Sequence, residues 1–245
     1  MAHHTYRTNL THIFIDWDDT LFPSTDLARL GYKVTTSKPA PDSLLGKQLA
    51  NLEAVVSQLL IQCIAYGTVV IVTNSEHGWV QKSAKHFMPS LVPLLDELTV
   101  MSARSLFERD RPFAYETWKY LAFKSALEKA ALPQMNILSL GDNAVEHKAA
   151  QRLGTDESLR WIKTVKYHAR PTIEILRMEN EVMCQQMYAL TMASTSSANY
   201  LKVNFAPPSP TDIDTDDEEL IAASPAVLQR TNDIRHTTDL PLPLP

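Results

Sequence analysis

Three carboxylates and a hydroxyl follow a short apolar stretch near the beginning of the chain. Residues 13–15 are Ile-Phe-Ile, and Asp16, Asp18, Asp19 and Thr20 come directly after them, with one tryptophan between the first two acids. The apolar and β-branched residues predict a buried strand. Carboxylates that cluster at the end of a strand repel one another unless a cation or a proton is bound between them. Because ligands of open parallel sheets bind beyond the carboxyl ends of the strands, we expect a binding site here.

Other polar residues follow later apolar stretches or begin a predicted helix. Thr73 and Asn74 come after a second buried strand, Asp142 after a third, and Glu146 lies one helical turn beyond Asp142. Lys119 lies near the start of a predicted helix. Cleavage of a phosphate monoester needs a nucleophile, a proton donor, a cation and donors that hold the phosphoryl oxygens. These residue types supply a candidate for each role.

The order of these residues resembles the four motifs of the haloacid dehalogenase superfamily of phosphohydrolases. Asp16-Trp17-Asp18-Asp19-Thr20 is similar to its first motif, Asp-x-Asp-x-Thr; Thr73 to its second; Lys119 to its third; and Gly141-Asp142 followed by Glu146 to its fourth. The resemblance covers about residues 10–155.

The resemblance implies a Mg²⁺-dependent phosphatase with an aspartyl-phosphate intermediate. Asp16 is then the nucleophile and Asp18 the general acid and base, while Thr73, Asn74 and Lys119 bind the phosphoryl group. The implied ligands of Mg²⁺ are Asp16, Asp18 (through its backbone carbonyl), Asp142 and Glu146 (directly or through water), which suits a hard cation that prefers oxygen.

Three points stay open at this stage. Lys124 competes with Lys119 for the third motif. Glu146 replaces the commoner aspartate, which leaves direct ligation undecided. Asp19 replaces a small residue, and we expect it to face solvent, or else to bind a partner group. The same residues would also serve a phosphotransferase or a protein that binds phosphorylated ligands without turnover.

Strands alternate with helices along the chain, which predicts an α/β fold: a Rossmann-like three-layer α/β/α sandwich with a mainly parallel central sheet. The predicted strands are 12–16, 68–73, 97–101, 136–140 and an edge strand at 160–167, and the predicted helices are 44–66, 78–88, 90–95, 115–130, 143–153 and 171–190.

We expect one phosphatase domain over residues 1–204, with a small flap at 22–43 and a terminal strand and helix within 160–190. Inserts that cap the site are therefore nearly absent, and an open site suits a phosphoprotein, although a small phosphate ester remains an alternative. Residues 205–245 are rich in proline and acids, which predicts a disordered tail that could bind protein partners.

Composition and charge indicate which partners to expect. The net charge is -5, and residues 206–245 contain eight acids and two arginines. No cluster of lysine and arginine predicts a nucleic-acid surface. No apolar run suggests a membrane span or a signal peptide. With only two cysteines, the expected compartment is the cytoplasm, with the nucleus as the alternative.

Overall fold

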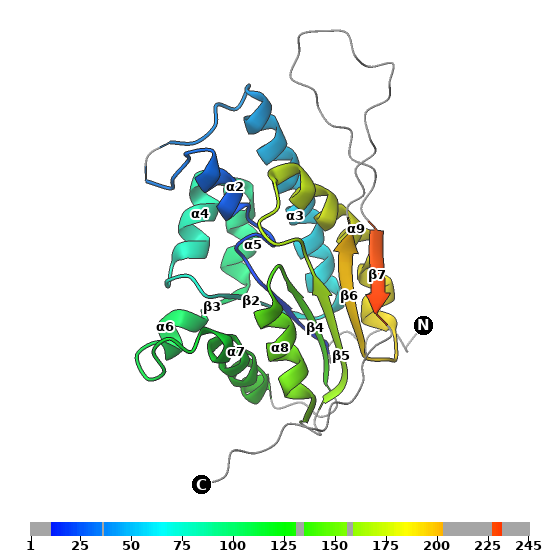
Figure 1. Cartoon of the computed structure of the whole chain (residues 1–245). Coiled ribbons are helices and arrows are strands. Elements are labelled where there is room, and N and C mark those ends of the chain that lie inside the picture. Colours follow the sequence, from blue (N-terminus) through cyan, green and yellow to red (C-terminus); the bar gives the residue numbers. More distant parts are fainter. Residues whose placement is uncertain (1–10, 36, 131–134, 156–158, 203–226, 232–245) are drawn as a thin grey trace.

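The computed structural model describes residues 11–35, 37–130, 135–155, 159–202 and 227–231. They form one seven-stranded sheet with helices on both faces (Figure 1), in the strand order β3-β2-β1-β4-β5-β6-β7. Strands β1 to β6 are parallel, and β7 is antiparallel to β6. The predicted Rossmann-like α/β sandwich is therefore confirmed.

The strands are β1 (Thr11–Ile15), β2 (Thr68–Thr73), β3 (Thr99–Ser102), β4 (Met135–Gly141), β5 (Leu159–Lys166), β6 (Ser197–Lys202) and β7 (Val227–Thr231). The α-helices are α2 (Ser24–Arg29), α3 (Leu44–Tyr66), α4 (Trp79–Phe87), α5 (Val92–Glu97), α6 (Ala103–Phe107), α7 (Tyr115–Ala130), α8 (Ala144–Arg152) and α9 (Ile173–Met192). Two 3₁₀ turns, η1 (Pro89–Leu91) and η2 (Leu153–Thr155), follow α4 and α8.

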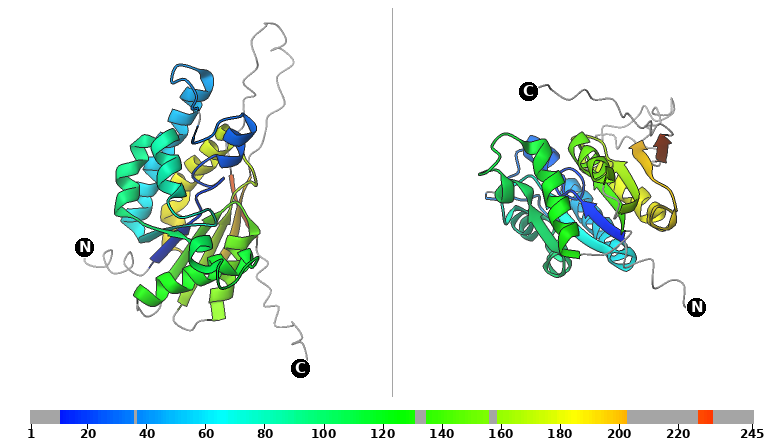
Figure 2. Two further views of the ribbon diagram at one scale, coloured as in Figure 1. Left: turned by 90° about the vertical axis from the view of Figure 1, so that its left-hand side faces the viewer. Right: turned by 90° about the horizontal axis from the view of Figure 1, so that it is seen from below.

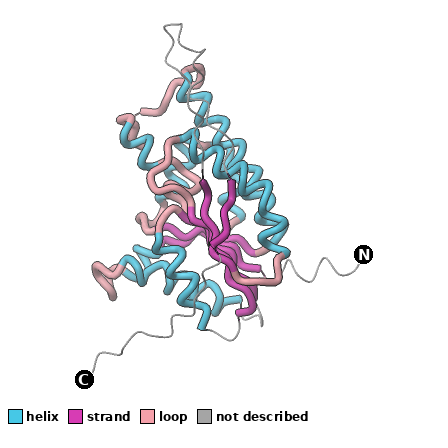
Figure 3. The backbone as a smooth tube through the Cα atoms, turned by 45° about the vertical axis from the view of Figure 1, so that its right-hand side comes forward, coloured by secondary structure: helices cyan, strands magenta, loops and turns pink. Residues whose placement is uncertain are grey.

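The two faces of the sheet carry separate apolar clusters, as the alternation of side chains along a strand requires. In β1, Ile13 and Ile15 belong to the cluster that includes α3 and α9, whereas Phe14 packs against α7 and α8 on the other face. Figure 2 shows these helices on opposite sides of the strands, and Figure 3 shows helices on both sides of the sheet. All five residues of β1 are buried, as the apolar stretch predicts.

The carboxyl end of β1 lies where the order in which strands are added to the sheet reverses its direction. β1 pairs with β2 on one side and β4 on the other, and Ile15 is level with Ile71 and Leu140. The connections from these two neighbours lead to opposite ends of the sheet. Such a topological switch point leaves a crevice beyond the strand ends, where α/β proteins bind ligands.

Strand β5 is not an edge strand, so that prediction was wrong. It pairs in parallel with both β4 and β6. Residues 197–202 read Ser-Ala-Asn-Tyr-Leu-Lys and lack the apolar run by which we recognised the other strands. The side-chain amide of Asn199 adds a link between β6 and β5, because its Nδ2 donates to the carbonyl oxygen of Thr164 at 3.0 Å.

Part of the predicted tail is ordered. Val227–Thr231 forms β7 and pairs with β6, which covers the backbone edge that β6 would otherwise expose. The rest of residues 205–245 lies outside the described residues. The prediction of a disordered tail is therefore wrong for these five residues, because sheet pairing stabilises a segment that its composition alone does not.

Helix α3 is, among the described residues, the one helix long and apolar enough by length and composition to cross a membrane. A core helix of a soluble protein passes the same test. Here its buried residues, from Leu49 to Cys63, pack in the apolar cluster with α9. We therefore describe α3 as a core helix. Its length and apolar composition nevertheless match those of a membrane span, which we did not expect from the sequence.

The segment predicted as a flap contains α2 and a loop. Asp26, which is buried, accepts a hydrogen bond from the backbone nitrogen of Ile173 at 2.9 Å. Farther along, the ring of His86 lies 3.2 Å from the carbonyl oxygen of Ser37. These contacts attach residues 22–43 to α9 and α4.

Candidate active site

A cavity of about 380 Å³ lies beyond the carboxyl ends of β1, β2 and β4. Its lining includes five carboxylates and one lysine. These residues are Asp16, Asp18, Asp19, Asp142, Glu146 and Lys119; the other lining residues are Ser24, Thr25, Asn74, Ser75, Asn143 and Val145. The fold thus brings together six of the seven predicted site residues, and the seventh, Thr73, contacts Asp18.

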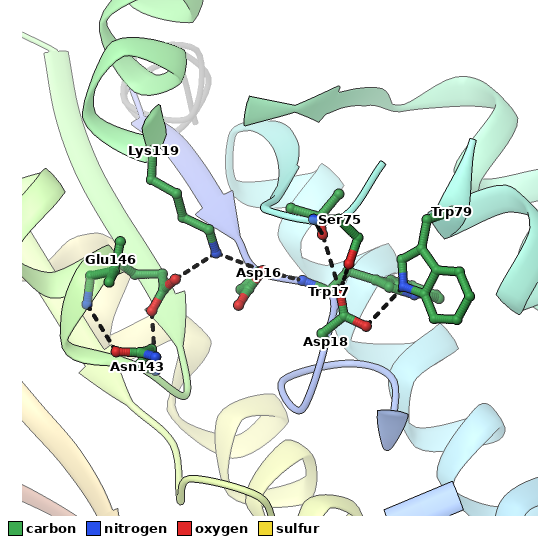
Figure 4. Close-up of polar contacts among 10 residues, drawn as sticks. Asp16, Trp17, Asp18, Ser75, Trp79, Lys119, Asn143 and Glu146 are labelled. Atoms are coloured by element: carbon green, nitrogen blue, oxygen red, sulfur yellow. Dashed lines mark hydrogen bonds and ion pairs between the residues drawn. The ribbon is translucent and has the colours of Figure 1, made fainter. Parts of the chain in front are cut away.

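Among the residues that line this cavity, Lys119 lies between two carboxylates (Figure 4). Its Nζ is 2.6 Å from Oδ1 of Asp16 and 2.5 Å from Oε1 of Glu146. All three side chains are buried. One cation therefore neutralises only part of the charge of the two acids.

Helix α7 brings Lys119 to the site rather than Lys124. Trp118, Ala122 and Phe123 of the same helix pack on the sheet, and Lys119 extends from this buried side to the end of β1. Lys124 lies on the exposed side, where its Nζ is 3.9 Å from Glu128. The helix period thus separates the two candidates for the third motif.

Burial and charge oppose each other in this group. Burial lowers the pKa of Lys119, but the carboxylates of Asp16 and Glu146 outweigh it and raise the pKa above its ordinary value. Burial raises the pKa of Asp16, Lys119 counteracts this, and the charges of Glu146 and Asp18 add to the rise. Lys119 therefore keeps its positive charge. It lies beside Asp16, which is buried close to two other negatively charged carboxylates.

The residues that resemble the fourth motif form a helix start that holds Glu146 in place. Asn143 caps α8 in a capping box, in which the backbone nitrogen of Asn143 donates to Oε2 of Glu146 at 3.1 Å. A Cβ atom at Gly141 would lie 2.5 Å from Cγ of Glu146, so only glycine fits there. Glycine is therefore needed so that Glu146 can fold back and reach Lys119.

Asp142 faces the cavity without a counter-ion of its own. Burial raises the pKa of its carboxyl to about 7, the charges of Glu146 and Asp19 add to the rise, and Lys119 and Lys166 oppose it. No hydrogen bond or ion pair from the described part of the chain reaches this carboxylate. Lys119 and Lys166 thus act on Asp142 from a distance, and its carboxyl oxygens have no direct ion pair among the described residues.

Asp18 is held by three donors on the side of β2 and α4. Thr73 Oγ1 and Ser75 Oγ donate to its Oδ2 at 3.1 and 2.9 Å, and Nε1 of Trp79 donates to its Oδ1 at 2.8 Å. Figure 4 shows Asp18 between Asp16 and the indole of Trp79. The carboxylate of Asp18 is therefore positioned by residues from two other elements.

Thr73, which resembles the second motif, has a role that the resemblance does not imply. The hydroxyl of Thr73 donates to Asp18 and accepts from the backbone nitrogen of Ser75 at 2.9 Å. Asn74 lines the cavity, and its Oδ1 is buried without a partner among the described residues. Asn74 and Ser75 thus line the cavity, whereas Thr73 supports Asp18 from behind.

Asp19 does not face solvent, and that expectation was wrong. It is 6% exposed, at a positive φ of 54° in the turn after β1. Its carboxylate accepts hydrogen bonds from the backbone nitrogen of Thr25 at 2.9 Å and from the hydroxyls of Ser24 and Thr25. Asp19 therefore binds the first turn of α2 and fixes that helix beside the cavity.

The donor set fits a hard divalent cation. One carboxylate oxygen from each of Asp16, Asp142 and Glu146 lies within 4.8 Å of the others. Lys119 and Trp17 contact only Oδ1 of Asp16, and no hydrogen bond or ion pair from the described residues reaches Oδ2. Oxygen donors of this kind suit Mg²⁺. Both oxygens of Glu146 already have protein partners, so Asp16 and Asp142 have the more available oxygens.

Several residues of the site were not predicted from the sequence. Asn143 carried a signal, because asparagine followed three residues later by glutamate is typical of a capping box. Ser75 and Trp79 carried none, since they reach Asp18 from the loop after β2 and from α4 only in the folded chain.

Comparisons with known proteins add nothing to this description of the site. No protein-family model, no curated protein sequence and no solved structure matches the chain.

Proposed function

We propose that this protein is a Mg²⁺-dependent phosphatase of the haloacid dehalogenase type, which hydrolyses phosphate monoesters. The observation that carries the proposal is the placement of Lys119 between Asp16 and Glu146, beside the unpaired carboxylate of Asp142. A nucleophilic carboxylate, a fixed cation and a cation-binding acid are what attack on a phosphate dianion requires.

In the proposed reaction, a carboxylate oxygen of Asp16 attacks phosphorus and the bond from phosphorus to the leaving oxygen breaks. Asp18, in its protonated form, gives a proton to that oxygen. The product is an aspartyl-phosphate on Asp16 and a free alcohol. Asp18 then removes a proton from water, which attacks phosphorus, and Asp16 and inorganic phosphate are released.

The remaining residues hold the phosphoryl oxygens. Lys119 offsets the charge of Asp16 and of the phosphate, and Asn74 and Ser75 line the same cavity. Thr73 does not line this cavity, and its hydroxyl donates a hydrogen bond to Asp18, so it supports the general acid and base. Mg²⁺ would be held by Asp16 and Asp142, with the backbone carbonyl of Asp18 and with Glu146 directly or through water, and it would supply further neutralisation of the phosphate.

The proposal is tested by hydrolysis of p-nitrophenyl phosphate with Mg²⁺ and with EDTA. We expect turnover only with Mg²⁺, and Asp16→Asn should lower kcat on the order of 10³-fold or more, because it removes the nucleophile. Asp96→Asn, a change of an exposed acid in α5, is the matched control.

Two outcomes would favour the alternatives. A protein that binds inorganic phosphate but releases none from any ester would be a binding module. A protein that gives phosphorylated products when alcohols are added would be a phosphotransferase, which uses the same core residues. Equal activity of Asp16→Asn and wild type would overturn the assignment of the nucleophile.

A further inference from the structure

A second cavity, of about 530 Å³, adjoins the acidic one and shares Ser75 with it. Its walls are the loop at residues 75–78, the side chains of Trp79 and Lys82 from α4, and Arg104 from α6. None of the residues that we assign to chemistry in the proposed function lines it, apart from the shared Ser75.

The wall of this second cavity is fixed by hydrogen bonds. Oγ of Ser102, at the end of β3, donates to the carbonyl oxygen of Ser75 at 2.6 Å. Oγ of Ser105, in α6, accepts from the backbone nitrogen of His77 at 2.9 Å. The loop after β2 is therefore attached to β3 and α6, and the cavity has a defined shape.

Asp18 lies at the boundary between the two cavities. It lines the acidic cavity, and two of its three donors, Ser75 and Trp79, line the second one. In the proposed reaction, Asp18 protonates the leaving oxygen. Figure 4 shows Trp79 on the side of Asp18 away from Lys119, so a group attached to that oxygen can extend toward Trp79.

The two cavities differ in charge. The acidic cavity has five carboxylates and one lysine, whereas the second has two cations, Lys82 and Arg104, and one carboxylate, Glu76. Lys82 is exposed, and Arg104 also binds Glu108 through Nε at 2.9 Å. The second cavity is therefore far less negative than the acidic one, and Lys82 and Arg104 are the groups there that attract an anionic part of a substrate.

We propose that the second cavity binds the leaving group of the substrate, and that Lys82 and Arg104 recognise a second anionic group on it. Preferred substrates are then phosphate monoesters that carry another phosphate or a carboxylate near the ester. This inference rests on the proposed phosphatase function, because it uses Asp18 as the donor to the leaving oxygen.

The test compares kcat/KM within two matched pairs of probes. One pair is a phosphoserine peptide with either glutamates or glutamines after the phosphoserine, and the other is propanediol monophosphate and its bisphosphate. We expect the anionic member of at least one pair to be preferred about fivefold or more, mainly through KM. The pair that shows the preference tells whether the second anion comes from a peptide or from a small molecule.

Variants then assign the preference to this cavity. The double variant Lys82→Ala/Arg104→Ala should bring the ratio of kcat/KM within the pair close to one, and Glu76→Gln should increase it. Lys85→Ala, an exposed lysine of α4 outside the cavity, is the matched control and should leave the ratio unchanged.

The outcomes separate this inference from the proposed function. Turnover of all probes without preference, or a preference that survives in the double variant, overturns the inference and leaves the phosphatase standing. No turnover of any probe with Mg²⁺ overturns both.

Discussion

Nε1 of Trp79 donates a hydrogen bond of 2.8 Å to Oδ1 of Asp18, which joins the first turn of α4 to the loop after β1. The indole ring also packs edge-on against Phe22 at a centroid distance of 6.2 Å. A rigid side chain thus sets the direction of the carboxylate that we propose as the general acid and base.

Loss of this hydrogen bond should slow turnover. We expect Trp79→Phe to lower kcat for p-nitrophenyl phosphate roughly tenfold, because a hydrogen bond to a charged group contributes about 1.5–3 kcal/mol. The change should appear in kcat and in its pH profile more than in KM. Urea denaturation of the same variant provides the control, since a purely structural role would change stability and leave the pH profile as in wild type.

Removal of Lys119 should destabilise the fold as well as the site. Lys119→Met leaves Asp16 and Glu146 buried without their cation, which costs about 3–5 kcal/mol in the free energy of unfolding at pH 7. Urea denaturation measures this cost, and adding Glu146→Gln to the variant should recover part of it. Lys124→Met, on the exposed side of the same helix, is the control and should change little. Equal effects of the two substitutions would contradict the central position of Lys119.

The raised pKa of Asp142 predicts a pH dependence that Mg²⁺ reverses. Its pKa is raised from 3.8 to about 7 in the folded chain, so between these values the folded state binds more protons than the unfolded state. Stability without divalent ions should therefore fall as the pH rises from about 4 to about 7. Mg²⁺ should bind more tightly above pH 7, where the carboxyl is ionised, and raise Tm most there.

Asp142→Asn tests the origin of this effect. It should remove this fall in stability and make the metal-free protein more stable at pH 8 by roughly 1–4 kcal/mol. It should also abolish most of the rise in Tm with Mg²⁺. A full response to Mg²⁺ in this variant would show that the ion binds elsewhere.

A second pH dependence is expected at His168 and Glu179. Glu179 is fully buried in α9, and its Oε1 accepts from the backbone nitrogen of His168 at 2.8 Å and lies 2.7 Å from Nδ1. The hydrogen bond to Glu179 raises the pKa of His168. A raised histidine pKa stabilises the fold fully below the unfolded value of 6.5, and this contribution is lost as the pH rises through the folded value.

His168→Gln should therefore lower stability more at pH 5.5 than at pH 8.5, with a difference of at most about 1 kcal/mol because the ring is partly exposed. Urea midpoints at the two pH values measure it. An equal loss at both pH values would mean that His168 acts through packing alone.

Fold class and most element positions could be predicted from the sequence because they follow from local patterns. The apolar run before Asp16 and the helical spacing over 44–66 each depend on one stretch of chain, and the structure places β1 and α3 there. Strand β6 and strand β7 lack such a pattern. They exist because the sheet offers an edge with which to pair, and that edge is a property of the folded chain.

By itself, the sequence determined which residues would reach the carboxyl ends of the strands: Asp16, Asn74 and Asp142 follow buried runs, and parallel strands end at one edge. Tertiary structure alone decided the partners of these residues. In the folded chain Lys119, and not Lys124, contacts Asp16. Asp19 binds the start of α2, and Trp79 contacts Asp18 although 61 positions separate them in the sequence. The physical reason is that strand periodicity fixes where a side chain begins, whereas ion pairs and hydrogen bonds depend on which distant elements pack against it.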